Sequence, residues 1–431
     1  MENDAFREIG NIESKDCLSV KGSNTYIPHP IAQRSFSFRG ETLASDAKAE
    51  MALVRLDEMV KRYPYASALR QILFRVESLA TVRSDGIVPD LMQILFLELI
   101  GKKKQNSPRL QKVYLRKNFP ESSLAIIEAS YEAFCCLQTL RYIMAFKPRA
   151  TGLTCDDLWY LYHSCMRGTR RERVAGLRRE DAAREGVVEK TSSSGVLYIP
   201  PRADQVEPLL QDLVDFCNGD SLSPLTRSAV EHFQLEAIRP VQQGADRLGR
   251  MFAFLVWKQC GLVESVFPPF SLTPAVQTQK HTELLIPYRT GQNFAQRTAM
   301  AALDNWVAHC TRATSRSVKL AYIYRDFISE TEERWRTMMP DIHKGSVLDL
   351  LLAELPGMPI VSVASVSEIT GKKFQAAAEA VARLIDVGIL IPLTSGKRNR
   401  IFIAQEVVDR LAQIDQTLLP EEATAREVFF K

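Results

Sequence analysis

The segment AIRPVQQGADRLGR, residues 237–250, combines residue types and spacings that are suited to chemistry. It is a turn containing Pro240 and Gly244, followed directly by the apolar helical stretch MFAFLVW. Arg247 and Arg250 fall at the start of that helix, where free backbone N–H groups already favour an anion. The pattern is typical of a loop that binds phosphate at a helix start, yet it contains no obvious catalytic group.

Helices are predicted on both sides of this loop. Apolar residues recur at helical spacing in residues 203–219 and 223–238 before it, and the helix after it extends to Cys260. The run VLYIPP, residues 196–201, predicts a short strand that ends at the double proline and forms a small β-hairpin edge. The same periodicity predicts further helices at 41–79, 88–101, 122–147, 154–168 and 295–339. The chain is therefore predicted to be mainly α.

Residues 340–415 follow a different pattern. An amphipathic helix at 346–357 precedes two helices that are closed by Gly371 and Gly388. Two β-rich runs then flank a Thr-Ser-Gly turn with a basic tip. This order of elements predicts a winged helix-turn-helix.

Length and composition set broad limits. A chain of 431 residues suggests two or three domains, and 46% apolar with 25% charged residues is ordinary for a soluble protein. The net charge of +4 says little about nucleic acid unless it is concentrated. The most basic window, residues 101–120, has seven Lys/Arg and no acid. It predicts a solvated loop with a short helix, or a surface for nucleic acid or an acidic partner.

The cysteines and the N-terminus indicate a cytoplasmic protein. Eight cysteines are scattered without a C-x-x-C or a His/Cys cluster at zinc spacing, so neither disulfides nor a metal site is predicted. The polar, acidic N-terminus does not resemble a secretory signal, and the longest apolar runs are shorter than a membrane span. We therefore expect reduced thiols and no membrane partner.

The loop and the helix before it resemble the signature of the Fic family (filamentation induced by cAMP), H-P-F-x-D/E-G-N-G-R-x-G-R. Supporting matches lie outside the loop. The segment LYHSCMRG, residues 161–168, with Gly176 and Arg178, resembles an earlier family segment, and VLYIPP resembles the flap that aligns the target chain. The helix that enters the motif is matched by His232, Phe233, Glu236 and Ile238, and the flap by Leu197, Tyr198 and Ile199.

The resemblance implies a fold, an activity and a set of partners. Fic proteins usually transfer AMP from ATP to a target hydroxyl, so it implies ATP as cofactor, a protein target at the flap and, in many cases, a homodimer. Many bacterial members have the architecture expected here, a Fic-type helical core followed by a winged helix. The expected parts are an irregular arm at 1–40, a helical segment at 41–145, the Fic-like core at 146–335 and the winged helix at 340–415.

The motif departs from the family at the positions that do chemistry. The family His is Arg239, whose guanidinium stays protonated and cannot accept a proton from the attacking hydroxyl. The family Asp/Glu that holds magnesium is Gln243, a neutral and weaker partner for a hard cation. The remaining departures are Val241 for Phe, Ala245 for Asn and Asp246 for Gly. The sequence therefore predicts no catalytic residue and no metal ligand, and Mg²⁺ is weakly supported.

Other motif positions are retained. Pro240 and Gly244 shape the turn, Gly249 permits close helix packing, and Arg247 and Arg250 keep cationic character. The candidate phosphate or nucleotide ligands are thus Gly244, Arg247, Gly249 and Arg250. Two interpretations stay open, since the arginines either pair with carboxylates of the fold or still bind phosphate.

The stretch TVRSDG, residues 81–86, resembles the S-x-x-x-E-G pattern of an inhibitory helix found in many family members. Asp85 stands at the position of the inhibitory Glu, one methylene shorter, and Gly86 is retained. In the family this carboxylate pairs with the second motif arginine. The resemblance therefore predicts a salt bridge between Asp85 and Arg250.

Two functions of different class remain. The first is a catalytically inactive Fic-fold protein with a regulatory role, binding protein or DNA. Its recognition helix is residues 372–387. Its DNA-binding candidates are Lys372, Lys373, Gln375, Lys397, Arg398 and Arg400. A winged helix used only for packing or dimerisation is the alternative for this region. The second function is an active AMP transferase (protein adenylyltransferase) with a different base, for which Asp246 or Glu236 is the candidate.

Overall fold

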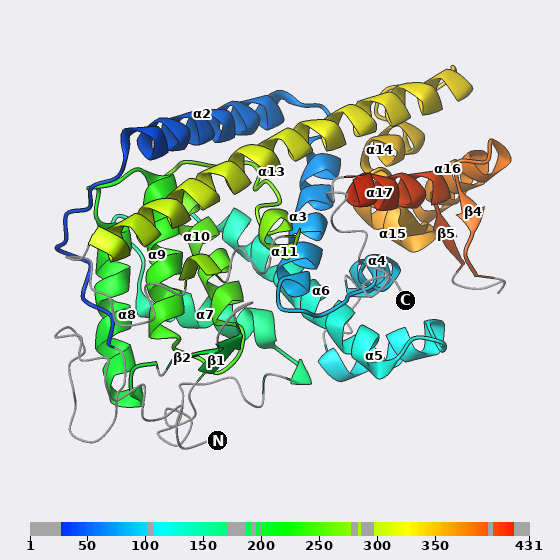
Figure 1. The fold of residues 1–431 in the computed structure, drawn as a ribbon. Helices are drawn as coiled ribbons and strands as arrows, with labels where there is room; N and C mark the ends of the chain where they lie inside the picture. The colour runs from blue at the N-terminus through cyan, green and yellow to red at the C-terminus, as the bar shows by residue number, and fades with distance from the viewer. Residues whose placement is uncertain are drawn as a thin grey trace. The chain divides into compact units, whose positions relative to one another are not determined.

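The chain is mainly α-helical with short strands (Figure 1). The computed structural model describes residues 27–101, 107–170, 172, 187–190, 195–198, 200–276, 283–285, 297–394 and 400–417. The chain divides into two compact units. The first comprises Met1–Val54, Thr139–Glu264 and Gln277–Ser315, and the second comprises Arg55–Gln138, Ser265–Val276 and Arg316–Lys431.

The first unit holds the motif loop. Its complete elements are α7 (Cys155–Met166), β1 (Val187–Lys190), β2 (Gly195–Tyr198), α8 (Ala203–Asn218), α9 (Pro224–Ile238) and α10 (Ala245–Gln259). Three longer helices contribute residues to both units: α2 (Gly40–Arg62), α6 (Leu124–Ala145) and α13 (Arg297–Met338). Strands β1 and β2 pair antiparallel, with Val187 opposite Tyr198. The predicted small β-hairpin is therefore confirmed as a strand pair.

Helix α9 is the buried centre of this unit. Every residue from Leu225 to Ile238 is buried, including its polar side chains. Buried polar groups need hydrogen-bond partners, and two indoles supply some of them. The Trp257 Nε1 donates to Ser228 Oγ at 2.7 Å, and the Trp306 Nε1 donates to the carbonyl oxygen of Ala229 at 2.8 Å. Both tryptophans are thus core residues with satisfied N–H groups.

The N-terminus of α9 is fixed by polar contacts. The Ser223 Oγ accepts from the backbone N–H of Thr226 at 3.1 Å, which caps the helix. The same hydroxyl donates to Asp46 Oδ2 at 2.6 Å, and the N–H of Leu225 donates to Glu50 Oε1 at 2.9 Å. Two carboxylates one turn apart on α2 therefore hold the start of α9.

The second unit is also helical and includes a small sheet. Its complete elements are α3 (Ala66–Arg83), α4 (Leu91–Gly101), α5 (Pro108–Asn118), α11 (Leu272–Val276), α14 (Val347–Glu354), β3 (Ile360–Ser362), α15 (Val363–Thr370), α16 (Phe374–Asp386), β4 (Ile391–Pro392), β5 (Ile401–Ile403) and α17 (Gln405–Thr417). One hydrophobic cluster joins α4 to the sheet and to α17 through Leu95, Leu99, Ile360, Ile403 and Val408.

The C-terminal elements follow the predicted order, with one addition. Helix α15 ends at Gly371 and α16 is followed by Gly388, both with positive φ, as expected of helix-ending glycines. The two β-rich runs form β4 and β5. The sequence missed β3, which pairs antiparallel with β5 and gives the sheet order β3-β5-β4. Three residues after Pro359 are too few to show a strand periodicity.

The basic window contains the short helix that its sequence predicts. Helix α5 begins with Pro108 at its first position, and residues 102–106 lie outside the described part of the chain. Lys112 pairs with Glu128 at 2.6 Å and lies 4.9 Å from the ring centroid of Tyr131. One cation of the window is therefore neutralised within the fold.

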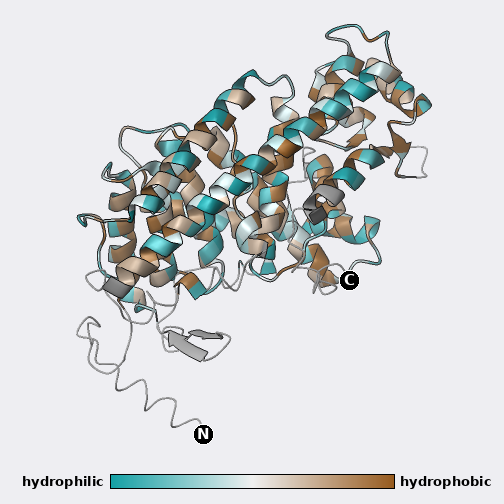
Figure 2. Ribbon diagram, turned by 45° about the horizontal axis from the view of Figure 1, so that its top comes forward, coloured by the Kyte–Doolittle hydropathy of each residue, from teal (hydrophilic) through white to brown (hydrophobic). Residues whose placement is uncertain are grey.

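Apolar and polar residues are interspersed along the helices (Figure 2). Among the residues that the structure describes, no helix has both the length and the hydrophobicity needed to cross a bilayer.

The carboxylates at the start of α9 generate a pH prediction. Burial raises the pKa of both Asp46 and Glu50, so the folded protein binds more protons than the unfolded chain above their ordinary pKa. The contribution of these two groups to the free energy of unfolding should therefore be greatest below their ordinary pKa and fall as pH rises through the raised values. Asp46→Asn keeps an acceptor for Ser223 but removes one linked proton. The free energy of unfolding of this variant should fall less steeply with rising pH than that of the parent. The two slopes should differ by at most about 1.4 kcal/mol per pH unit.

Urea unfolding over a series of pH values measures this slope. Asp220→Asn, at an exposed position, is the control. An unchanged slope in Asp46→Asn, or an equal change in the control, would show that Asp46 is not the linked group.

Candidate functional site

The motif loop begins at Arg239, which closes α9 in a left-handed conformation. Its φ is 46° and its ψ is 64°, and it is the one non-glycine residue with positive φ in the described ranges. Such a conformation is uncommon for a residue with a long side chain and costs roughly 1 kcal/mol. The N–H of Arg239 donates to the carbonyl oxygen of Leu235 at 2.7 Å. The position where the family has its base is thus also the point where the chain turns.

Gly244 ends the loop and starts α10. Its φ of 79° is accessible to glycine, and a Cβ there would lie 2.3 Å from Met166 Cε of α7. The Tyr162 hydroxyl, also on α7, donates to the carbonyl oxygen of Gln243 at 3.2 Å. Helix α7 begins at a capping box in which Thr154 and Asp157 satisfy each other's N–H groups. The turn shape that the sequence assigns to Gly244 therefore depends on contact with α7.

The other substituted positions differ in exposure. Gln243, at the family's metal position, is exposed, as is its neighbour Gln242. Val241, where the family has Phe, is fully buried. The loop thus presents neutral amides to solvent and buries its one aliphatic side chain.

The two retained arginines are buried in α10. Arg247 is 0% exposed and Arg250 is 1% exposed. The Arg250 Nη1 donates to Asp246 Oδ2, one helical turn earlier. This contact agrees with the interpretation in which an arginine pairs with a carboxylate of the fold. The predicted pair between Asp85 and Arg250 joins residues of different units, so it stays a prediction.

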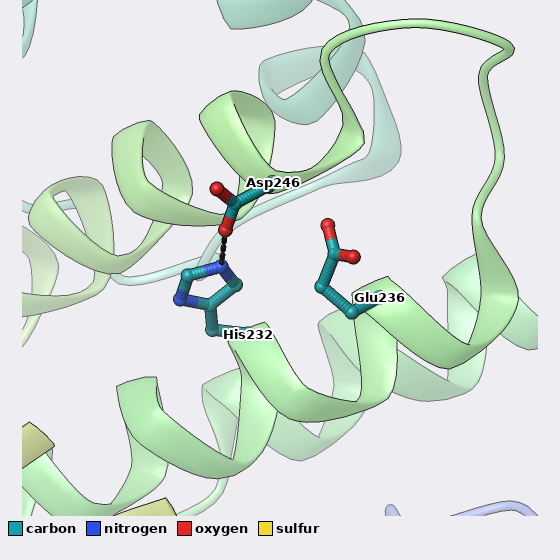
Figure 3. Close-up of side chains that lie close together, drawn as sticks. All are labelled: His232, Glu236 and Asp246. Atoms are coloured by element: carbon teal, nitrogen blue, oxygen red, sulfur yellow. Dashed lines mark hydrogen bonds and ion pairs between the residues drawn. The ribbon is translucent and has the colours of Figure 1, made fainter. Parts of the chain in front are cut away.

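Asp246 also contacts the helix before the loop (Figure 3). Its Oδ1 lies 2.8 Å from His232 Nε2, while its Oδ2 faces Arg250. The Glu236 carboxylate, one turn after His232 on α9, points toward the same space. The ligand atoms of His232, Glu236 and Asp246 all lie within 4.8 Å of one another. Sequence analysis identified His232 as a match to the entering helix and Glu236 or Asp246 as an alternative base, and it did not predict that the three side chains meet.

The imidazole of His232 is held by packing. A Cβ at Gly249 would lie 2.4 Å from its Cδ2, so the absence of a side chain at 249 makes room for the ring. On another side the ring meets Trp306 edge to face, with centroids 5.3 Å apart. Gly249, a nucleotide-binding candidate in the sequence, therefore has a packing role in the structure.

A second buried carboxyl lies nearby on α9. Burial, with added repulsion from Glu236, raises the pKa of Glu231 well above its ordinary value. Neither carboxyl oxygen of Glu231 has a hydrogen-bond partner. Burial at this position therefore disfavours the charged form of the carboxyl.

The remaining predicted site residues lie elsewhere in the fold. Leu197 and Tyr198 belong to β2, whereas Ile199, Lys397 and Arg398 lie outside the described residues. Asp85 and Gly86 form the turn after α3, where Gly86 has a φ of 75°. At the start of α16 the exposed side chains are Lys372, Lys373, Phe374 and Gln375. Arg400 is exposed and lies over the Phe402 ring at 5.0 Å.

Residues 152–256 match the sequence model of the Fic/DOC family. This range contains α7, β1, β2, α8, α9, the loop and most of α10. The chain contains a Fic/DOC family domain. The resemblance expected from the motif residues is thereby confirmed, and the domain is the part of the chain that positions His232, Arg239 and Asp246.

Solved structures similar to this chain are also Fic proteins. A Fic family protein from Desulfovibrio desulfuricans G20 is 14% identical, with 86% of this chain and 98% of that chain covered and a TM-score of 0.48. Fic-1 (aa134–508) from C. elegans is 17% identical, with 65% and 73% covered and a TM-score of 0.42. A Fic domain containing signaling protein from Bacteroides thetaiotaomicron VPI-5482 is 16% identical, with 59% and 97% covered and a TM-score of 0.36.

The contact between Gly249 and His232 predicts the effect of adding one methyl group. Gly249→Ala should destabilise the protein by roughly 1–2 kcal/mol, because overpacking costs about 1–3 kcal/mol and the gain in helix propensity is about 1 kcal/mol or less. Gly40→Ala is the matched control, since a Cβ there has no atom within 4 Å. Thermal or urea unfolding measures both variants. A gain in stability of about 1 kcal/mol in Gly249→Ala would mean that the ring of His232 moves at no cost.

Proposed function

We propose that this Fic-fold protein does not transfer AMP and has a regulatory role that it performs by binding. The observation that carries the proposal is the pair formed by Asp246 and Arg250 at the start of α10. In the family pattern this arginine belongs to the loop that receives phosphate. Here a carboxylate of the same helix already occupies its guanidinium.

The loss of the base supports the same conclusion. AMP transfer requires removal of a proton from the attacking hydroxyl, and a positioned general base typically contributes a hundredfold to ten-thousandfold in rate. Arg239 stays protonated and has no acceptor site. The two carboxylates that could replace it are poorly placed, because Glu236 is 4% exposed and Asp246 is engaged by both His232 and Arg250.

Charge at the helix start argues against nucleotide binding. Helix N-termini favour anions through free N–H groups and the helix dipole. Asp246 is an acidic residue in the first turn of α10 and satisfies that preference from within the chain. A triphosphate would have to approach this carboxylate, and like charges repel.

The binding function is assigned to residues 340–415 as a winged helix-turn-helix that contacts DNA. Lys372 and Lys373 directly precede α16 and Gln375 lies in its first turn; all three are exposed and are residue types that hydrogen-bond base edges. Arg400, which directly precedes β5, is exposed and suited to contacting a DNA phosphate. Phe374, between these polar residues, is also exposed.

Calorimetric titration with ATP tests the first part. The native chain is expected to show no ATP binding with or without Mg²⁺, and Arg239→His alone should not restore self-modification with labelled ATP. Asp246→Gly removes the internal anion, so it should bind ATP at least about tenfold more tightly than the native chain, or about 1.4 kcal/mol. Gln242→Ala, at an exposed loop position, is the control. Tight, magnesium-dependent binding by the native chain would instead favour the AMP transferase.

Fluorescence anisotropy with a pool of random duplexes tests the second part. Binding at low salt should weaken as salt rises, because Lys and Arg release counterions from phosphates. Lys372→Ala and Lys373→Ala should each cost about 1–3 kcal/mol, and Arg400→Ala should reduce the salt slope by about 1. Lys319→Ala, on an exposed face of α13, should change neither. Equal losses of DNA affinity in all four variants would indicate nonspecific charge attraction. If the native chain binds no DNA, the winged helix would instead serve packing or dimerisation.

A further inference from the structure

We propose that His232, Glu236 and Asp246 form a binding site for a divalent transition-metal ion, with Zn²⁺ as the preferred ion. The site does not include Gln243, the residue at the family's metal position, and it does not depend on whether the protein binds DNA. His232 and Glu236 come from α9, and Asp246 comes from the first turn of α10 (Figure 3).

The arrangement of ligand atoms fits one ion. The imidazole Nε2 of His232 and the Oδ1 of Asp246 are 2.8 Å apart, a hydrogen-bond distance that is shorter than the roughly 3.4 Å between two ligands of a tetrahedral ion with bonds of about 2.1 Å. All three ligand atoms lie within 4.8 Å of one another. Binding of one ion would therefore require Glu236 to move closer and the His232–Asp246 hydrogen bond to open by roughly 0.6 Å, both by rotation of side chains.

The surroundings hold two of these ligands in place. Residues four apart on a helix project from the same face, so His232 and Glu236 are adjacent by helix geometry. The ring of His232 packs against Gly249 and Trp306, which restricts its rotation. Arg250 holds Asp246 Oδ2, which leaves Oδ1 directed at the site. Such outer contacts orient metal ligands and raise affinity.

The charge and burial of the three groups favour a cation. Glu236 is 4% exposed and His232 is 2% exposed, and a buried carboxylate is costly unless a positive charge lies close to it. Asp246 is 25% exposed at its side chain, so the ion can enter from that side and retain a water ligand.

The ligand set selects the class of metal. One imidazole nitrogen and two carboxylates are typical of Zn²⁺ and of neighbouring first-row ions, whereas Mg²⁺ prefers oxygen ligands and water. Three protein ligands leave at least one position open around zinc. Asp246 stands where the family pattern has glycine, so the third ligand is particular to this chain.

Titration of the full-length protein with Co²⁺ and Zn²⁺ tests the proposal. Co²⁺ serves as a spectroscopic substitute for Zn²⁺, and its visible absorption reports on ligand type. We expect saturable one-to-one binding, with Zn²⁺ displacing Co²⁺ and excess Mg²⁺ failing to do so. Binding of Zn²⁺ should also raise the unfolding temperature, because the ion binds the folded state.

Variants of the same shape identify the ligands. Glu236→Gln and Asp246→Asn should each weaken Co²⁺ and Zn²⁺ binding at least about tenfold. The reason is that losing a charged ligand lowers metal affinity more than losing an outer contact does. His343→Ala removes an exposed histidine elsewhere and should leave affinity unchanged. Circular dichroism and unfolding without metal show whether each variant is folded.

Three results would overturn the assignment. They are the absence of saturable one-to-one binding, equal affinity in the parent and both folded variants, and thiolate charge-transfer bands in the Co²⁺ spectrum. The last would assign the ion to cysteines, of which Cys310 is buried in the same unit. If one variant fails to fold, the other still decides, because each removes a different ligand.

Discussion

The complete burial of α9 is the constraint on which the candidate site depends. A helix with no exposed residue between Leu225 and Ile238 must find partners for its polar side chains inside the protein. Indole N–H groups from α10 and α13 meet Ser228 and a backbone carbonyl, and Asp246 meets His232. The side chains that define the site are therefore fixed by the same contacts that make the helix stable.

Burial also explains why the loop keeps its shape although its chemistry has changed. The turn is fixed by backbone features, namely a left-handed Arg239, a glycine at 244 and the contact with α7. None of these requires a general base or a metal ligand. The residues found at 239 and 243 are therefore compatible with the turn.

The sequence predicted local structure well because local structure follows from local patterns. Apolar periodicity located the helices on both sides of the loop, and glycines with positive φ ended α15 and α16 where expected. The Fic resemblance rests on a linear motif, so it too could be found from a local sequence pattern. The three-residue strand β3 was missed because a segment of that length has no periodicity of its own.

Contacts between side chains were harder to predict, because they depend on how two helices pack. The sequence indicated that Asp246 places negative charge where an anion binds, but it paired Arg250 with Asp85 and left Asp246 without a partner. The spacing of four between Arg250 and Asp246 was the available signal, since residues so spaced share a helix face. The convergence of His232, Glu236 and Asp246 had no such signal, because fourteen positions and a turn separate the first residue from the last.

Because Gly249 contacts His232, the effect of a substitution at either position depends on the residue at the other. Glycine is required at 249 only while a ring occupies the space beside it, and in a helix glycine is otherwise less favourable than alanine by about 1 kcal/mol. A smaller side chain at 232 would remove that requirement and make alanine at 249 favourable. The order of substitution therefore matters, because the change at 232 has to come first, and lineages that keep the histidine are confined to glycine at 249.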